Sequence, residues 1–403
     1  MELDQATKRR FVVVLGFLTA MGATAVDMSL AAIPDMASAL GTSLASGQQI
    51  IGVFVLGLGL GQIPAGLMAD RIGRMPVVYA GVVLFTIAGL ATSFAPTIEI
   101  MLATRFVQGL GASVGIVMAR AIVRDLATNE EAARLFSILA MIFTIAPVLA
   151  PIVGGFLVAH VGWRAPFVAV AAFGGIVLVL VATVLHETGQ PFRNGNAGQQ
   201  LAASVREFFS HRRSILGTAL VVVAAMGFMT VISGASALIM EIYAYSAPQF
   251  GFIFATAGLT ILAASIVNRR LLLRFNVLQM TGLGALIVGV AALQLLIIAR
   301  LGHAPFWWVW SCTCLYLAGF SFLFANATAM ALAPVPKVSG VSASLIGSLQ
   351  NSLSAVSAIG AALIYDGSVA CSVVLMGIFG TLVFVIFAGR NRILRGPLYL
   401  ARG

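Results

Sequence analysis

Long apolar stretches, repeated along almost the whole chain, constrain the fold more than any other feature of this sequence. Twelve of them are long enough for a helix of about 20 residues to cross the hydrocarbon core of a bilayer. They cover residues 11–33, 47–68, 76–95, 98–120, 134–159, 165–186, 214–240, 248–267, 276–299, 305–333, 339–364 and 370–389. Because only 9% of the 403 residues are charged, the chain lacks the polar cover that a water-soluble protein needs. The sequence therefore predicts an all-α membrane protein with twelve transmembrane helices.

The positions of the basic residues predict how these helices are oriented. Of the 23 Lys and Arg residues, all but Arg105, Arg164 and Arg300 fall at the termini or in loops on one side of the predicted membrane. Cytoplasmic loops carry such an excess, so we expect both termini in the cytoplasm and the protein in a bacterial inner membrane. The net charge of +10 is then explained by topology, which removes the reason to expect a nucleic-acid partner.

The first stretch also fits a second interpretation. Lys8-Arg9-Arg10, an apolar run and then Ala23-Thr24-Ala25 form the pattern of a cleaved signal peptide. Cleavage would leave eleven spans and would break the one-sided distribution of basic residues. We therefore favour a retained first span.

A long loop separates the predicted helices into two sets of six. The expected parts are an N-terminal half over residues 1–186, a cytoplasmic linker over 187–213 and a C-terminal half over 214–403. Asp70-Arg71 follows the second span and Asn268-Arg269 follows the eighth, at matching positions in the two halves. This repetition indicates a duplicated architecture, in which substrate binds near the middle of the membrane where the repeats meet.

Within the linker, apolar residues recur at the spacing of a helix. Leu201, Val205, Phe208 and Phe209 share one face, and Arg206 lies off it. Short helices with this pattern lie in the membrane interface with the apolar face toward the lipid. We therefore predict an amphipathic helix on the inner leaflet.

Two charged residues stand inside the predicted spans, Asp27 in the first and Arg105 in the fourth. Ionisable residues are costly in hydrocarbon and are functional candidates for that reason. At 1.5 Å per residue both lie roughly 10 Å below the outer surface, so they can meet. One interpretation is a permanent structural salt bridge. The other is that burial favours the protonated carboxyl group, which makes Asp27 the proton-coupling site and Arg105 the residue that adjusts it.

Other side chains in the spans are candidates for contact with a substrate, although neutral polar groups in membranes more often join neighbouring helices. The candidates are Met28, Gln62, Gln108, Asn326 and Gln350. Asp35 and Glu241 lie at outer span ends, and their participation in proton coupling is left open.

Three local motifs go beyond composition. Residues 66–74 read GLMADRIGR, residues 105–111 read RFVQGLG and residues 146–155 read APVLAPIVGG. In this order, and at these positions among twelve spans, they resemble the signature of the major facilitator superfamily, and the third is similar to the motif of its drug:proton antiporters. Residues 26–30, 119–126, 162–164 and 326–330 resemble the bicyclomycin/chloramphenicol-resistance branch. Ser29, Ala31 and Met75 depart from that branch, so its substrate preference is not carried over.

The first motif contains residues that can form a charge network at a tight turn. The resemblance implies that this network acts as a conformational latch that holds the two halves in the outward-open state. The latch residues are Gly66, Asp70, Arg71, Gly73, Arg74 and Asp125. Gly73 permits the turn between the second and third spans. A solvated loop that follows the charge bias explains the arginines but neither Asp70 nor Gly73.

The third motif combines bending and small residues in the fifth span. Pro147 and Pro151 remove backbone donors and favour a bend. Gly154 and Gly155 allow another helix to approach closely. A hinge or a seal against leakage fits this combination, and packing alone is the alternative.

These observations predict a secondary transporter that exports small amphiphilic molecules in exchange for protons by alternating access, and that functions as a monomer. The alternative is a proton-coupled importer of a nutrient on the same fold, and a channel or scaffold that does not alternate is a third. The sequence contains no phosphate-binding loop of the G-x-x-x-x-G-K-[ST] type and no cluster of metal ligands. We therefore expect no enzyme activity, no cofactor and no metal.

Overall fold

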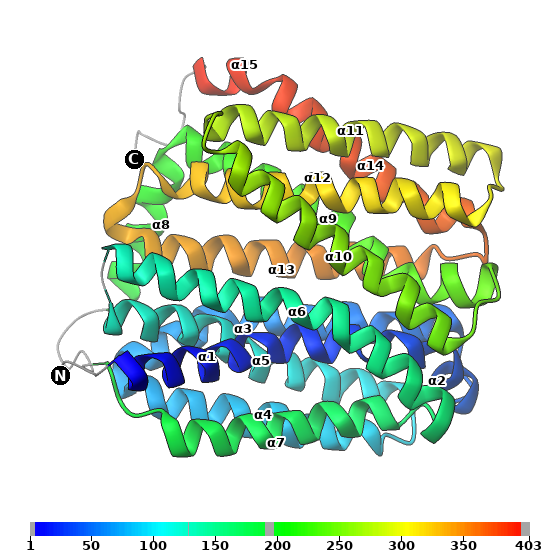
Figure 1. The fold of residues 1–403 in the computed structure, drawn as a ribbon, viewed down its shortest axis with the longest axis horizontal. Helices are drawn as coiled ribbons and strands as arrows, with labels where there is room; N and C mark the ends of the chain where they lie inside the picture. The colour runs from blue at the N-terminus through cyan, green and yellow to red at the C-terminus, as the bar shows by residue number, and fades with distance from the viewer. Residues whose placement is uncertain (1–4, 128, 190–196, 396–403) are drawn as a thin grey trace. The chain divides into compact units, whose positions relative to one another are not determined.

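The computed structural model describes residues 5–127, 129–189 and 197–395, and these residues form helices without any β-strand (Figure 1). The chain divides into two compact units. Unit 1 comprises Met1–Gly195 and Tyr245–Ala255, and unit 2 comprises Asn196–Ala244 and Thr256–Gly403. The predicted all-α fold class is confirmed.

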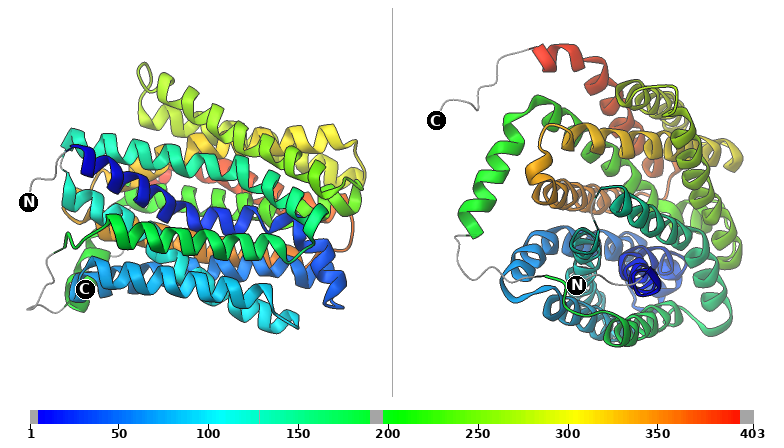
Figure 2. Two further views of the ribbon diagram at one scale, coloured as in Figure 1. Left: turned by 60° about the horizontal axis from the view of Figure 1, so that its bottom comes forward. Right: turned by 60° about the vertical axis from the view of Figure 1, so that its left-hand side comes forward.

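Unit 1 contains seven α-helices of the chain and the first part of an eighth. They are α1 (Gln5–Asp27), α2 (Ile33–Ala39), α3 (Leu44–Ile72), α4 (Arg74–Ser93), α5 (Ile98–Leu126), α6 (Asn129–Val161), α7 (Ala165–Val184) and the start of α10 (Ala247–Leu271), with the 3₁₀ turn η1 (Leu30–Ala32) between α1 and α2. The long helices run side by side within the unit (Figure 2).

Unit 2 contains the remaining helices and the rest of α10. They are α8 (Ala197–Ser210), α9 (Arg212–Ser236), the π-helical segment η2 (Ala237–Ile242), α11 (Val277–Leu301), α12 (Phe306–Leu332), the 3₁₀ turn η3 (Pro336–Val338), α13 (Ser339–Leu363), α14 (Val369–Ala388) and α15 (Arg390–Arg395). Here α9 packs against α12, α13 and α14.

Eleven helices in the described part of the chain are long and apolar enough to cross a membrane. The twelfth predicted span, over residues 339–364, also forms a helix, α13, and its 25 residues are long enough for a crossing. Its sequence is less apolar because it carries seven serines together with Gln350 and Asn351. A helix of this composition requires protein or water around its polar side chains, since lipid cannot satisfy them.

Several spans begin at a polar side chain that caps the first turn. Ser43 accepts a hydrogen bond from the amide of Ser46 (3.1 Å), and Ser368 accepts one from the amide of Cys371 (3.1 Å). Asn276 and Gln279 form a reciprocal capping box before α11. Each cap satisfies amides that the helix leaves unpaired and contributes about 1 kcal/mol. These caps fix where the loops end and the spans begin.

Close approach of backbones holds α3 against α5 in unit 1. A Cβ atom added at Gly57 would lie under 3.0 Å from the carbonyl oxygen of Phe106, and one added at Gly109 would lie equally close to that of Phe54. In membranes, helices associate through such contacts between small residues, because lipid supplies no hydrophobic drive between them. The crossing brings Arg105, one turn before Gly109, toward the interior of unit 1.

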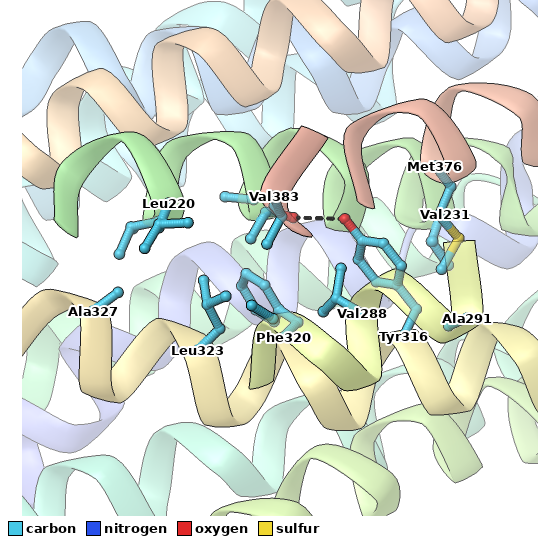
Figure 3. Close-up of a cluster of buried hydrophobic side chains, with 14 of the residues drawn as sticks. Leu220, Val231, Val288, Ala291, Tyr316, Phe320, Leu323, Ala327, Met376 and Val383 are labelled. Atoms are coloured by element: carbon cyan, nitrogen blue, oxygen red, sulfur yellow. Dashed lines mark hydrogen bonds between the residues drawn. The ribbon is translucent and has the colours of Figure 1, made fainter. Parts of the chain in front are cut away.

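The core of unit 2 surrounds Tyr316, which donates a hydrogen bond from its hydroxyl to the carbonyl of Ala224 (3.3 Å; Figure 3). The predicted linker helix exists as α8, but it does not present its whole apolar face to lipid. Phe208 is fully buried in this core, and Phe209 packs beside it. The expected contact of Phe208 with the leaflet is wrong, because α9 and α13 lie close enough to cover the ring.

Candidate functional site

Asp27 is the last residue of α1, at a break in the first predicted span. Helix α1 ends there, η1 follows, and the chain turns into α2. Pro34 at the start of α2 explains the break, since it has no amide hydrogen for an α-helical bond and its ring collides with the preceding turn. The span predicted over residues 11–33 is therefore interrupted and continues to Ala39.

The carboxyl group of Asp27 lies inside unit 1. Its side chain is 6% exposed, and it is the one buried carboxylate among the residues that the structure describes. Within the same residues it forms no hydrogen bond and no ion pair. A buried carboxyl group without a cationic partner is stable mainly in its neutral form.

Arg105 on α5 is fully buried. It forms hydrogen bonds at the end of α1 and does not pair with Asp27. Its Nη2 donates to the carbonyl of Ala25 (3.1 Å) and to Oγ of Ser29 (3.0 Å), and its Nη1 donates to Oε1 of Gln108 (3.0 Å). Ala25 in the last turn of α1 and Ser29 just after α1 stand on either side of Asp27 in the sequence. Asp27 and Arg105 form no salt bridge in this structure, which argues against the alternative of a permanent ion pair.

Aromatic rings complete the surroundings of the guanidinium group. Its carbon lies 4.7 Å from the ring centroid of Phe54 and 5.6 Å from that of Phe167. Rings at these distances attract a cation in a site without water. Neither ring could be predicted from the sequence, because the rings come from α3 and α7 and no local pattern links them to Arg105.

The predicted latch residues lie together at one end of unit 1. Arg74 bridges two carboxylates, with Nη1 2.7 Å from Oδ1 of Asp70 and Nε 3.2 Å from Oδ2 of Asp125. Gly73 has φ +97°, a conformation that favours glycine. Arg71 is exposed and takes no part in these two ion pairs, and Gly66 is half-buried, where an added Cβ atom would lie 3.7 Å from Cγ1 of Val117.

Glu187, which sequence analysis did not select, completes this cluster. Its carboxylate accepts hydrogen bonds from the amides of Arg74 (2.9 Å), Met75 (3.0 Å) and Gly189 (2.9 Å). It thereby caps the start of α4, where the helix dipole favours a negative charge. Burial opposes ionisation, but the bonds from these backbone amides outweigh it and lower the pKa of Glu187 below its ordinary value of 4.5.

We expect Glu187→Gln to lower the thermal unfolding midpoint of the purified protein by about 2 °C at pH 7, because a cap contributes about 1 kcal/mol. A carboxyl group whose pKa is lowered by folding stabilises the protein above its unfolded pKa, and this contribution is lost as the pH falls through the folded pKa. The difference from wild type should therefore persist from pH 7 down to the ordinary pKa of 4.5 and shrink as the pH falls below that value. Glu207→Gln, an exposed acid on α8, is the control, and an equal effect in both variants would contradict the assignment.

The proline- and glycine-containing segment of α6 packs by backbone contact within unit 1. Helix α6 is continuous through Pro147 and Pro151. A Cβ atom at Gly154 would lie under 3.0 Å from the carbonyl oxygen of Met28, and one at Gly155 would lie as close to that of Ala247 at the start of α10. Gly154 therefore touches the residue that follows Asp27.

The proposed substrate contacts differ in their surroundings. Gln62 is 1% exposed, and neither polar atom of its amide has a partner. Gln108 accepts from Arg105, whereas Asn326 donates to Oδ1 of Asn268 (2.8 Å) and is buried. Met28 is buried and Gln350 is half-buried on α13. Of the five, Gln62 has an amide that is buried and entirely unsatisfied.

Unit 2 contains an aromatic stack that the sequence did not reveal. The rings of Phe228 on α9 and Phe320 on α12 lie parallel, with centroids 4.6 Å apart and planes 3° apart. Phe324 lies one turn further along α12, with its centroid 5.6 Å from that of Phe320 and its ring plane tilted by 34°. Phe228 and Phe324 remain partly exposed. Flat apolar rings of this kind can stack with an aromatic ligand.

Together, the apolar spans and the buried charges define a multi-pass α-helical membrane protein. The model of the Major Facilitator Superfamily matches residues 13–360. The multidrug resistance protein MdtL of Shigella flexneri is 31% identical, covering 95% of this chain and 96% of that protein. The bicyclomycin resistance protein homolog of Haemophilus influenzae is 26% identical, covering 86% of this chain and 87% of that protein. The chain belongs to the Major Facilitator Superfamily.

Solved structures share the fold at low sequence identity. A D-xylose-proton symporter aligns with a TM-score of 0.77 at 14% identity, covering 94% of this chain and 96% of that one. A POT family transporter in complex with a thioalcohol-conjugated peptide aligns with a TM-score of 0.75 at 16% identity, covering 95% of this chain and 96% of that one. These likenesses confirm the predicted fold with its two six-helix halves.

Proposed function

We propose that this protein exports small amphiphilic molecules, drugs among them, in exchange for protons across a bacterial inner membrane. The observation that carries the proposal is Asp27, a buried carboxyl group without an ion-pair partner in the part of the chain that the structure describes. The relatives named for multidrug and bicyclomycin resistance support the direction of transport and the class of substrate.

In the mechanism that we propose, Asp27 binds and releases the proton that drives export. Protonated Asp27 favours one orientation of the transporter and bound substrate favours the other, so the two ligands shift one equilibrium in opposite directions. Arg105 acts as a positioning residue, because it holds the backbone on both sides of Asp27 through Ala25 and Ser29. Within unit 1, the substrate contact that we propose is the buried and unsatisfied amide of Gln62.

The proton gradient across energised inside-out vesicles tests this function. Drug pumped into the lumen by an antiporter must be accompanied by release of protons from the lumen, which a pH-sensitive dye reports. We expect at least one amphiphilic compound of a diverse antibiotic panel to cause such release in vesicles that contain the protein and none in vesicles without it. If the rate of proton release from the lumen does not depend on any drug in a diverse panel, the proposal is contradicted.

Substitution of a latch residue should lower the transport rate by a moderate factor. Asp70→Asn removes the ion pair with Arg74, and we expect transport to slow about fivefold, as for loss of about 1 kcal/mol from a partly exposed pair. Because Arg74 joins Asp70 to Asp125, the double variant Asp70→Asn/Asp125→Asn should be less impaired than the product of the single effects. Wild-type transport by Asp70→Asn at equal expression would exclude the latch.

A further inference from the structure

A hollow of about 470 Å³ lies in unit 2, and none of the residues that we propose for proton coupling lines it. It is formed where three segments meet: the start of α9, the residues just after α12, and α15. The lining residues are Ser210, His211, Arg212, Arg213, Ala333, Pro334 and Leu394. It therefore has a basic side and an apolar side, and none of its lining residues is acidic.

The basic side of the hollow is held in place by hydrogen bonds. Nη1 of Arg212 donates to the carbonyl of Ile393 (2.9 Å), which joins α9 to α15. Nδ1 of His211 lies 3.0 Å from the carbonyl oxygen of Glu207 and 3.2 Å from Oγ of Ser210. Arg213 is exposed. Among the residues that the structure describes, no carboxylate forms an ion pair with Arg212.

The charges are placed unfavourably unless an anion is present. The start of a helix carries a partial positive charge from its unpaired amides, and cations there are destabilising. Helix α9 has no acidic residue in its first turn and no side-chain cap. The bias of basic residues toward the cytoplasm explains why arginines occur on this side, but it does not explain why they surround one hollow at a helix start.

We propose that this hollow binds the phosphate group of an anionic membrane phospholipid such as phosphatidylglycerol. Arg212, Arg213 and the start of α9 would hold the phosphate, and Ala333, Pro334 and Leu394 would contact the glycerol and the first acyl carbons. Basic pockets at the cytoplasmic ends of transmembrane helices bind such headgroups. The apolar side favours a lipid over free phosphate. The site rests on the membrane orientation proposed above, but not on the transported substrate.

Retention of lipid by the purified full-length protein tests this site. After incubation with phosphatidylglycerol or phosphatidylethanolamine of matched acyl chains, bound lipid is counted by native mass spectrometry. We expect wild type to retain phosphatidylglycerol preferentially and Arg212→Gln/Arg213→Gln to bind it about tenfold more weakly. Arg269→Gln/Arg270→Gln removes the same charge from exposed positions at the end of α10 and should change binding less than about twofold.

Two further measurements keep the result interpretable. Arg213→Glu leaves the bond between Arg212 and Ile393 intact, so weaker binding in this variant supports the site even where the double variant unfolds. Equal loss of lipid binding in the α10 control, or full retention of lipid by both hollow variants, overturns the proposal.

Competition with inorganic phosphate is the second measurement. Displacement of the lipid by millimolar phosphate at constant ionic strength would assign the hollow to free phosphate, whereas retention of the lipid supports the proposal. None of these readouts requires transport, so their failure is distinct from failure of the proposed export function.

Discussion

Asp27→Asn will abolish proton-driven export while the protein stays folded. Asparagine has nearly the same shape as protonated aspartic acid but cannot release a proton. We expect the rate of drug transport driven by a pH gradient to fall at least about 100-fold, the lower range for loss of an essential proton-transfer group. Folding should survive because no cation pairs with Asp27, so the substitution leaves no charge newly unpaired.

The measurement uses purified protein in proteoliposomes with an imposed pH gradient. Asp27→Glu keeps a titratable group and should retain part of the proton-driven rate, and Glu99→Gln removes an exposed acid from the start of α5 without effect. The wild-type rate should change with pH at constant drug concentration, whereas any residual movement of drug by Asp27→Asn should not. A proton-driven rate near wild type in Asp27→Asn would remove Asp27 from the mechanism.

The sequence predicted the features that depend on local pattern. Apolar stretches of about 20 residues predicted the spans because bilayer thickness sets their length. The turn at Gly73 and the ion pair between Asp70 and Arg74 follow from a short motif, since the tight turn at Gly73 brings the end of α3 beside the start of α4. Asp27 and Arg105 stood out because charges inside spans are costly.

Features that depend on distant parts of the chain were not predicted. Glu187 caps a helix that begins 113 positions earlier, and no local spacing signals that contact. Arg105 and Asp27 lie at similar depth, yet the direction of the arginine side chain is decided by acceptors on Ser29 and Gln108. Pro34 does not by itself predict the break after Asp27, because α6 continues through Pro147 and Pro151.

Gly154→Val will impair transport severely because it changes the backbone beside the proposed proton site. A Cβ atom at this position would meet the carbonyl oxygen, the carbonyl carbon and the Cα atom of Met28, which are backbone atoms that cannot rotate away. Either α6 or the turn after Asp27 must therefore move. Overpacking of this kind costs about 1–3 kcal/mol in stability, and small displacements of a reacting group can cost about 100-fold in rate.

Comparing stability with transport separates the two interpretations of the α6 segment. If Gly154 serves packing alone, Gly154→Val should lose transport only in proportion to the protein that unfolds. If it sets the position of Asp27, folded Gly154→Val should bind drug and yet fail to use the proton gradient. Gly175→Val on α7 is the matched control, because a Cβ atom there has nothing within 4 Å. Wild-type transport and stability in Gly154→Val would show that α6 can retreat from Met28 without consequence, and the link from this helix to Asp27 would then be withdrawn.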